Sequence, residues 1–175
     1  MTAIDDGPSQ GSRAAPVLER VFPKALDNRY RGHAVALWIF GLLVVFKAMI
    51  SLVSLADPAR GYAADGIPLN TYSPAAAQAV IGVGAYLDVE LLMLVLLFVL
   101  ALVRYRAMVP LMYVVLAIEF LAHRGAGLWR PIARIGGSSA SFTTLGVFAL
   151  TLIGLALAVT GRGYRAKADE VSSSA

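Results

Sequence analysis

Four long apolar runs alternate with shorter polar stretches along the chain. The runs cover about residues 33–56, 75–103, 107–123 and 142–160. Each matches or exceeds the roughly 17–25 residues that an α-helix needs to cross the hydrocarbon core of a bilayer. The pattern therefore predicts an all-α protein, a four-transmembrane-helix bundle.

Turn-forming residues mark the ends of these runs. Asp57-Pro58 ends the first run, because proline disfavours helix in the residue before it. Ser73 is a suitable N-cap for the second helix, with proline following at the first helical position. The basic turn at 104–106 is so short that the second and third helices must run antiparallel.

The sequence allows two structures for each of two connections between the runs. The 57–74 connection carries three prolines and two glycines, and we interpret it as a linker; the alternative is that it folds back onto the bundle and caps a cavity. The 124–141 segment holds three arginines, several glycines and Trp129. It predicts either an interfacial helix or an extension of the third spanning helix.

The basic residues predict the orientation. Residues 1–26 and 162–175 are polar and read as disordered cytoplasmic tails around a four-span membrane domain over 27–161. Lys and Arg are more numerous on the side of the two tails and the short turn than on the opposite side, which predicts that both termini are cytoplasmic. They are Arg13, Arg20, Lys24, Arg29, Arg31, Arg104, Arg106, Arg162, Arg165 and Lys167.

Composition supports a membrane protein and excludes several chemistries. Hydrophobic residues make up 58% of the chain and charged residues 15%, whereas soluble domains average about 45–50% and about 25%. The absence of cysteine excludes disulfides, thiolate metal sites and iron–sulfur clusters. No phosphate-binding, zinc-protease or serine-hydrolase motif is present, so we expect no enzyme activity, no cofactor and no metal. The net charge of +4 is explained by topology, and we expect no nucleic-acid partner.

Four charged residues fall within the apolar runs: Lys47, Asp88, Glu90 and Glu119. At about 1.5 Å per residue, all four lie roughly 18–22 Å from the cytoplasmic ends of their helices. This common depth predicts an intramembrane polar network with Lys47 as the counter-charge. His123 follows Glu119 by four residues on the same helix face and is a further candidate member.

The chain has three functional interpretations, and the polar network enters the first two. The first is a non-enzymatic accessory or structural membrane subunit, in which polar contacts hold the helices in register. The alternative is a small ion- or proton-coupled transporter that acts as an oligomer, because intramembrane carboxylates often mark such pathways. An intramembrane enzyme is a third interpretation, without a residue set to support it. The bilayer is the expected partner, together with a second copy or a larger membrane complex.

Small residues recur at roughly four-residue spacing in two of the runs and predict close helix packing or a homo-oligomeric contact. They are Ala75, Ala79, Gly82 and Gly84 in the second run, and Gly146, Gly154 and Ala158 in the fourth.

Three polar segments carry a resemblance to a known group of proteins. Residues 27–33 (DNRYRGH), 64–69 (ADGIPL) and 103–110 (VRYRAMVP) resemble segments of small four-span bacterial membrane proteins without an assigned function. The resemblance covers about residues 27–160. It implies a bacterial cytoplasmic (inner) membrane protein and assigns no functional residue.

Overall fold

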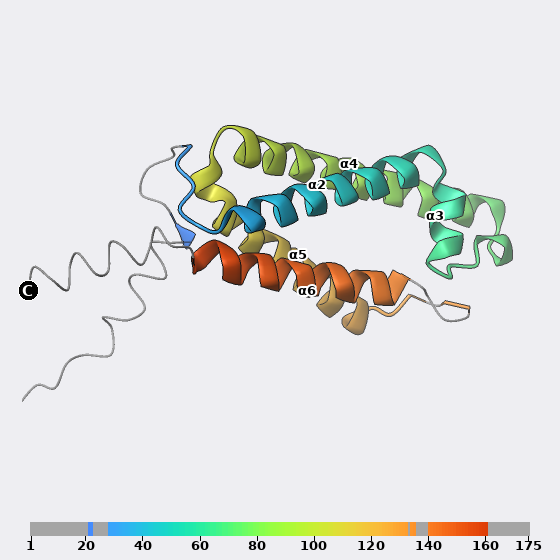
Figure 1. The fold of residues 1–175 in the computed structure, drawn as a ribbon. Coiled ribbons are helices and arrows are strands. Elements are labelled where there is room, and N and C mark those ends of the chain that lie inside the picture. The colour runs from blue at the N-terminus through green and yellow to red at the C-terminus, as the bar shows by residue number, and fades with distance from the viewer. Residues whose placement is uncertain (1–20, 23–27, 133, 136–139, 161–175) are drawn as a thin grey trace, which may run out of the picture.

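The computed structural model of the chain describes residues 21–22, 28–132, 134–135 and 140–160 (Figure 1). The predicted tails over 1–26 and 162–175 lie outside the described residues, apart from residues 21 and 22. The described part contains helices and no strand, which confirms the predicted all-α class.

Four helices are long and apolar enough to cross a membrane, and they form the predicted bundle. They are α2 (Ala34–Ala56), α4 (Pro74–Val103), α5 (Val109–Trp129) and α6 (Ala140–Val159). Three shorter segments connect them: α3 (Pro58–Ala64), η2 (Leu69–Thr71) and η3 (Arg106–Met108).

Side-chain caps or prolines mark the starts of α3, α4 and α5. The Oγ of Ser73 accepts the backbone N–H of Ala76 at 3.3 Å, and a proline is the first residue of α4, as the sequence predicts. Asp57 caps α3 in the same way, its Oδ1 accepting the backbone N–H of Arg60 at 3.2 Å. Pro110 lies in the first turn of α5, where no intrahelical donor is needed.

The third spanning helix is longer than the predicted 107–123 segment. It continues to Trp129, so the first part of the 124–141 segment extends the helix and does not form a separate interfacial one. Its side chains from 121 to 130 are exposed. A Cβ added at Gly125 or Gly127 would meet no atom within 4 Å. The extension therefore projects past the packed part of the bundle.

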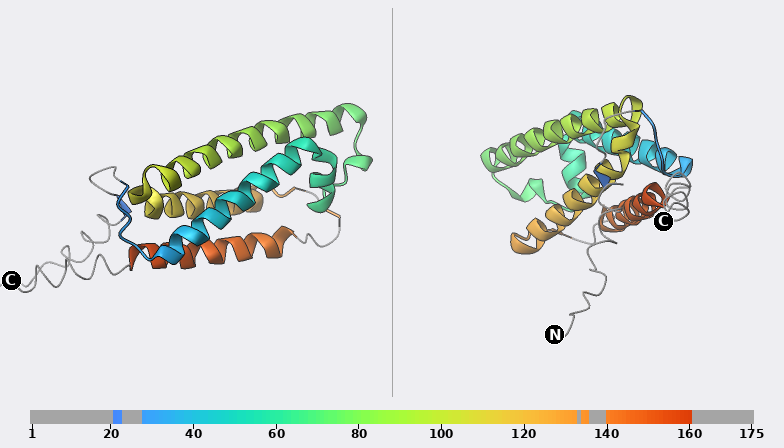
Figure 2. Two further views of the ribbon diagram at one scale, coloured as in Figure 1. Left: turned by 45° about the horizontal axis from the view of Figure 1, so that its top comes forward. Right: turned by 90° about the vertical axis from the view of Figure 1, so that its left-hand side faces the viewer.

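The bundle has two unlike ends. The backbone N–H of His33, just before α2, donates to the carbonyl of Leu157 in α6 at 3.2 Å, so α2 begins where α6 ends. We call this the terminal end, and the opposite end, where α3 lies, the α3 end (Figure 1). Helix α2 packs mainly against α4 and α6, and α5 packs against α6. Along its length α2 diverges from α6 toward the α3 end (Figures 1 and 2).

The buried core gathers at the terminal end. The ring of Phe40 in α2 meets Phe98 of α4 and Tyr113 of α5 edge to face, with centroids 5.6 and 5.2 Å apart. The Tyr113 hydroxyl donates to the carbonyl of Ala36 at 2.6 Å. The other core residues are Leu43, Val44, Val95, Ala101, Val109, Met112, Leu116 and Ala158. These contacts close the bundle at this end.

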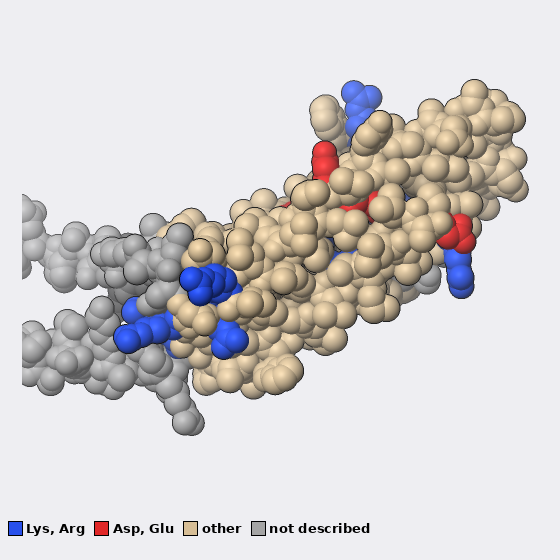
Figure 3. All heavy atoms as spheres, turned by 90° about the horizontal axis from the view of Figure 1, so that it is seen from above, with Lys and Arg blue, Asp and Glu red and all other residues tan. Residues whose placement is uncertain are grey.

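The outer surface of the bundle is apolar. Only 17–28% of the residues in each spanning window are buried inside the protein. Many large aliphatic and aromatic side chains are therefore exposed, and on the face that Figure 3 shows, charged side chains interrupt the surface at few places. Such a surface is stable in lipid and not in water, so the chain is a multi-pass membrane protein.

Some of the predicted small residues allow close contact, and others do not. A Cβ at Gly154 would overlap the Tyr113 ring, and a Cβ at Gly84 would overlap the hydroxyl of Tyr62. By contrast, Gly82 and Gly146 have no atom within 4 Å of an added Cβ. Close packing by small residues is therefore limited to particular positions on α4 and α6.

Candidate functional site

An ion pair joins α2 to α5 in the middle of the bundle. The Nζ of Lys47 donates to Oε1 of Glu119 at 2.6 Å. The two side chains are 20% and 15% exposed. Since α2 and α5 make few close backbone contacts, these long side chains bridge a gap between the two helices. The structure thus brings together two of the four charged residues that the sequence places at one depth.

The carboxylate of Glu119 is only half satisfied. Its Oε2 is buried and has no hydrogen-bond partner among the described residues. The Nδ1 of His123 lies 4.0 Å from Oε1, too far for a hydrogen bond, and the His123 side chain is 68% exposed. His123 is therefore a near neighbour of the pair and not a bonded member of it.

The two acidic residues of α4 stand apart from this pair. Glu90 is exposed and Asp88 half-buried, and neither forms a hydrogen bond or ion pair within the described part of the chain. Helix α4 packs against α2 and makes far fewer contacts with α5. The structure thus shows a Lys47–Glu119 pair in place of the expected network of four charges.

Asp88 lies instead near the contact between α3 and α4. The Tyr62 hydroxyl of α3 donates to the carbonyl of Val80 at 3.0 Å, beside the close approach at Gly84. Burial raises the pKa of Tyr62 above its usual 10, and the negative charges of Asp88 and Asp65 raise it further. The Tyr62 pKa is therefore higher in the folded chain than in the unfolded chain. The hydrogen bond from Tyr62 to Val80 contributes its full stabilisation below pH 10, and this stabilisation is lost as the pH rises through the raised pKa. Nothing in the hydropathy pattern predicts this contact between Tyr62 and α4.

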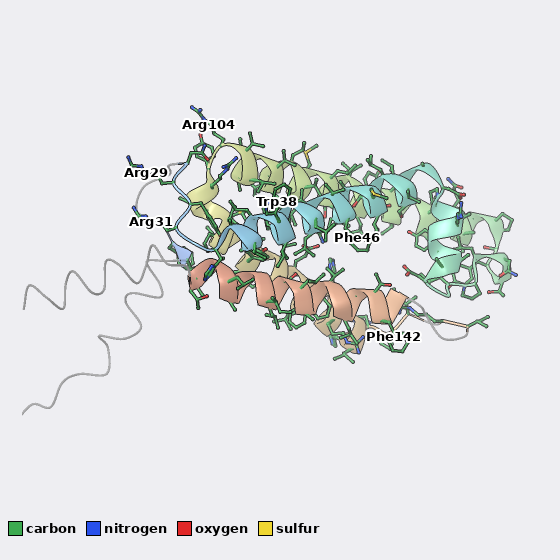
Figure 4. All side chains as sticks on the ribbon, viewed as in Figure 1. Arg29, Arg31, Trp38, Phe46, Arg104 and Phe142 are labelled. Atoms are coloured by element: carbon green, nitrogen blue, oxygen red, sulfur yellow. The ribbon has the colours of Figure 1, made fainter. Side chains whose placement is uncertain are left out.

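A cavity of about 720 Å³ lies beside the ion pair. Helices α2, α5 and α6 form most of its wall, and Leu91 is the contribution of α4. Its charged and titratable lining residues are Lys47, Asp65, Glu119, His123, Arg124 and Arg134. The cavity opens to the surroundings, because His123, Arg124 and Leu128 on its wall are exposed. It lies where α2 diverges from α6, and Phe46 of α2 points into the space between these two helices (Figure 4).

The 57–74 connection forms part of the mouth of this cavity. Ala64 and Asp65 line the wall, and the carbonyl of Gly66 accepts the backbone N–H of Ile135 at 2.9 Å. The interpretation of this connection as a simple linker therefore misses its contribution to the cavity. Asp65 and Arg134 were not predicted as site residues, and their positions in turn-rich segments gave no signal beyond topology.

Gly66 is expected to stabilise the backbone turn that forms this side of the cavity mouth. It has a φ of 75°, which side chains with a Cβ rarely adopt, and an added Cβ would lie 3.2 Å from the carbonyl oxygen of Ile135. Gly66→Ala should lower the free energy of unfolding by about 1–2 kcal/mol. Thermal unfolding in detergent measures this, with Gly127→Ala as the control, since Gly127 is helical and uncrowded. Equal melting temperatures for the two variants would contradict the expectation.

The fold and the site define the class of protein: a four-helix membrane protein with an open cavity at one end and an ion pair on the cavity wall. Among the described residues no group of three or more His, Asp or Glu side chains could hold a metal ion. Comparison of the chain with protein-family models, curated proteins and solved structures finds no match.

Proposed function

We propose that this chain is a non-enzymatic, small proton-coupled transporter that acts as an oligomer, with Glu119 as the group that exchanges the proton. One observation carries the proposal: Glu119 lines an open cavity, and one of its carboxylate oxygens is buried without a hydrogen-bond partner among the residues that the structure describes. A pair whose only role is to hold two helices together is best packed on all sides and fully hydrogen-bonded. This pair borders a space large enough for a ligand.

The ion pair supports a coupling of proton and ligand. When a proton from water binds Glu119, the carboxylate becomes neutral and Lys47 loses its counter-charge. An anionic group can then take the place of the carboxylate beside the ammonium of Lys47. A proton and an anionic group that enter together leave the net charge of the site unchanged, whereas a proton that enters alone and leaves on the other side carries one positive charge across the membrane. Release of both restores the Lys47–Glu119 pair.

The charge distribution supports an orientation for this proposal. Arg29, Arg31 and Arg104 lie at the terminal end of the bundle (Figure 4). By the positive-inside rule this end faces the cytoplasm, so the cavity at the α3 end opens to the outside. In a bacterial inner membrane, the cavity then faces the side from which a proton gradient drives protons inward.

Liposomes test the proposal. The purified protein is reconstituted with a pH-sensitive dye inside, and proton influx is measured under a pH gradient and under a valinomycin-clamped potential. We expect influx with the wild type and with Glu90→Gln, which removes an exposed acid that forms no ion pair with a described residue. We expect Glu119→Gln to reduce influx at least tenfold. Absence of influx in the wild type under both gradients would overturn the proposal.

A second candidate is an accessory or structural membrane subunit, alone as a homo-oligomer or within a larger complex. The short 2.6 Å bond between Lys47 and Glu119 favours it, because this bond fixes α2 relative to α5. This function requires the pair for stability and requires no proton influx. The liposome assay therefore separates the two candidates.

A further inference from the structure

We propose that the cavity at the α3 end binds an anionic amphiphile, a molecule with a carboxylate or phosphate head and an acyl-type tail. The inference deepens the proposed function, on which it rests, by naming the chemical class of ligand for the same cavity. Three features of the described residues carry it: an excess of positive charge, an apolar wall and the arrangement of the two along the cavity.

The charged side chains of the cavity leave a positive excess. Lys47 and Glu119 neutralise each other, which leaves Arg124 and Arg134 against Asp65. Neither arginine forms an ion pair or a side-chain hydrogen bond within the described part of the chain. A guanidinium presents donors in a planar fork that matches a carboxylate or phosphate. The two free arginines therefore favour an anionic head group.

The rest of the wall is apolar and partly aromatic. Phe120 of α5 and Phe148 of α6 stack with centroids 4.0 Å apart and ring planes 13° apart. They line the cavity together with Phe46, Ile50 and Leu116. The volume of about 720 Å³ lies within the range typical of small-molecule sites. A free inorganic anion would leave this apolar wall unused, whereas an acyl tail would cover it.

The charged and apolar parts follow one another along the bundle. Arg124 lies five residues beyond Glu119 on α5, about 7 Å nearer the α3 end, and Arg134 follows the end of that helix. Leu116 lies on the opposite side of Glu119, toward the closed core. The arginines thus receive the head at the mouth while the tail runs inward. Lys47, once Glu119 is protonated, offers the head a second position deeper in the cavity.

Photo-crosslinking locates such a ligand. The wild-type protein in phosphatidylcholine nanodiscs is exposed to diazirine-bearing dodecanoate or to the matching neutral dodecanol, and labelled peptides are mapped by mass spectrometry. We expect dodecanoate to label the peptides around Phe46 and Phe148 saturably and about tenfold more strongly than dodecanol, the ratio that one charge-assisted contact supplies. Equal cavity labelling by the acid and the alcohol would overturn the inference.

Matched arginine variants test the head-group contact. Arg124→Gln and Arg134→Gln should each reduce cavity labelling by dodecanoate severalfold and leave labelling by dodecanol unchanged. Arg130→Gln is the control, because Arg130 is exposed outside the cavity, 5.1 Å from the centroid of the Trp129 ring. An equal loss in Arg130→Gln would contradict a specific site.

Competition identifies the source of the ligand. Excess dodecyl phosphate should compete with the probe, and inorganic phosphate should not, because it lacks a tail. Competition by phosphatidylglycerol would identify a membrane lipid as the ligand. If phosphatidylglycerol does not compete, the ligand is a free molecule that resembles a fatty acid. Competition by inorganic phosphate would overturn the inference. Cavity labelling without proton influx in liposomes would overturn proton coupling alone, whereas influx with equal labelling by acid and alcohol would overturn the ligand class alone.

Discussion

Lys47→Met is expected to lower the free energy of unfolding by about 3 kcal/mol. The substitution keeps a long apolar side chain and removes only the ammonium that donates to Glu119 at 2.6 Å. Glu119 then has no hydrogen-bond donor among the described residues, since its other oxygen already lacks one. An uncompensated charge in a largely buried position between two helices is strongly destabilising. Unfolding in detergent with increasing denaturant measures the loss.

A double-mutant cycle shows whether the loss comes from the broken pair. Lys47→Met combined with Glu119→Gln replaces both charges by neutral groups, and it should regain most of the stability that Lys47→Met loses. Glu90→Gln is the matched acidic control and should leave stability unchanged, because Glu90 is exposed and forms no ion pair within the described residues. If the double variant is no more stable than Lys47→Met, the pair does not explain the loss.

The fold could be predicted from the sequence because a bilayer imposes a simple requirement on length and polarity. A spanning helix must satisfy its backbone internally and present apolar side chains for about 20 residues, and both properties are visible along the chain. Ser73, Pro74 and Pro110 fix helix starts for equally local reasons. The exception is the end of α5, where exposed residues up to Trp129 continue a helix that the hydropathy pattern ends near His123.

The site could be predicted only in part, because a sequence gives depth along a helix and not the neighbour that a side chain meets. Lys47 and Glu119 lie at one depth and also face each other. Asp88 lies at a similar depth, but α4 packs mainly on α2, and Asp88 lies near Tyr62 of α3 instead. Which helices are adjacent depends on packing between residues far apart in the chain, such as Phe40, Phe98 and Tyr113.

The cavity could not be predicted for a related reason. It exists because α2 diverges from α6 toward the α3 end, and a hydropathy pattern is the same for parallel and diverging helices. Its mouth depends on a long-range hydrogen bond between Gly66 and Ile135, two residues in segments without periodicity. Arg124 and Arg134 lie at the mouth of the cavity. From the sequence they are interpreted as topology determinants, because basic residues commonly flank membrane-spanning helices.

Gly154→Ala is expected to destabilise the closed end of the bundle by about 2 kcal/mol. An added Cβ at this position of α6 would overlap the Tyr113 ring of α5. Tyr113 cannot move away freely, because it is fully buried, packs against Phe40 and donates to the carbonyl of Ala36 at 2.6 Å. Relief of the overlap must therefore separate α6 from α5 or break this hydrogen bond. Thermal unfolding in detergent should show a melting temperature lower by several degrees.

Gly146→Ala is the matched control on the same helix. Its added Cβ would meet no atom within 4 Å, and alanine favours helix over glycine by about 1 kcal/mol, so this variant should be as stable as the wild type or more stable. The opposite signs at Gly154 and Gly146 would show that close packing, and not helix propensity, determines the effect at Gly154. If both variants were stabilised alike, α6 would not approach Tyr113 closely, and the terminal end of the bundle would not be closed by this contact.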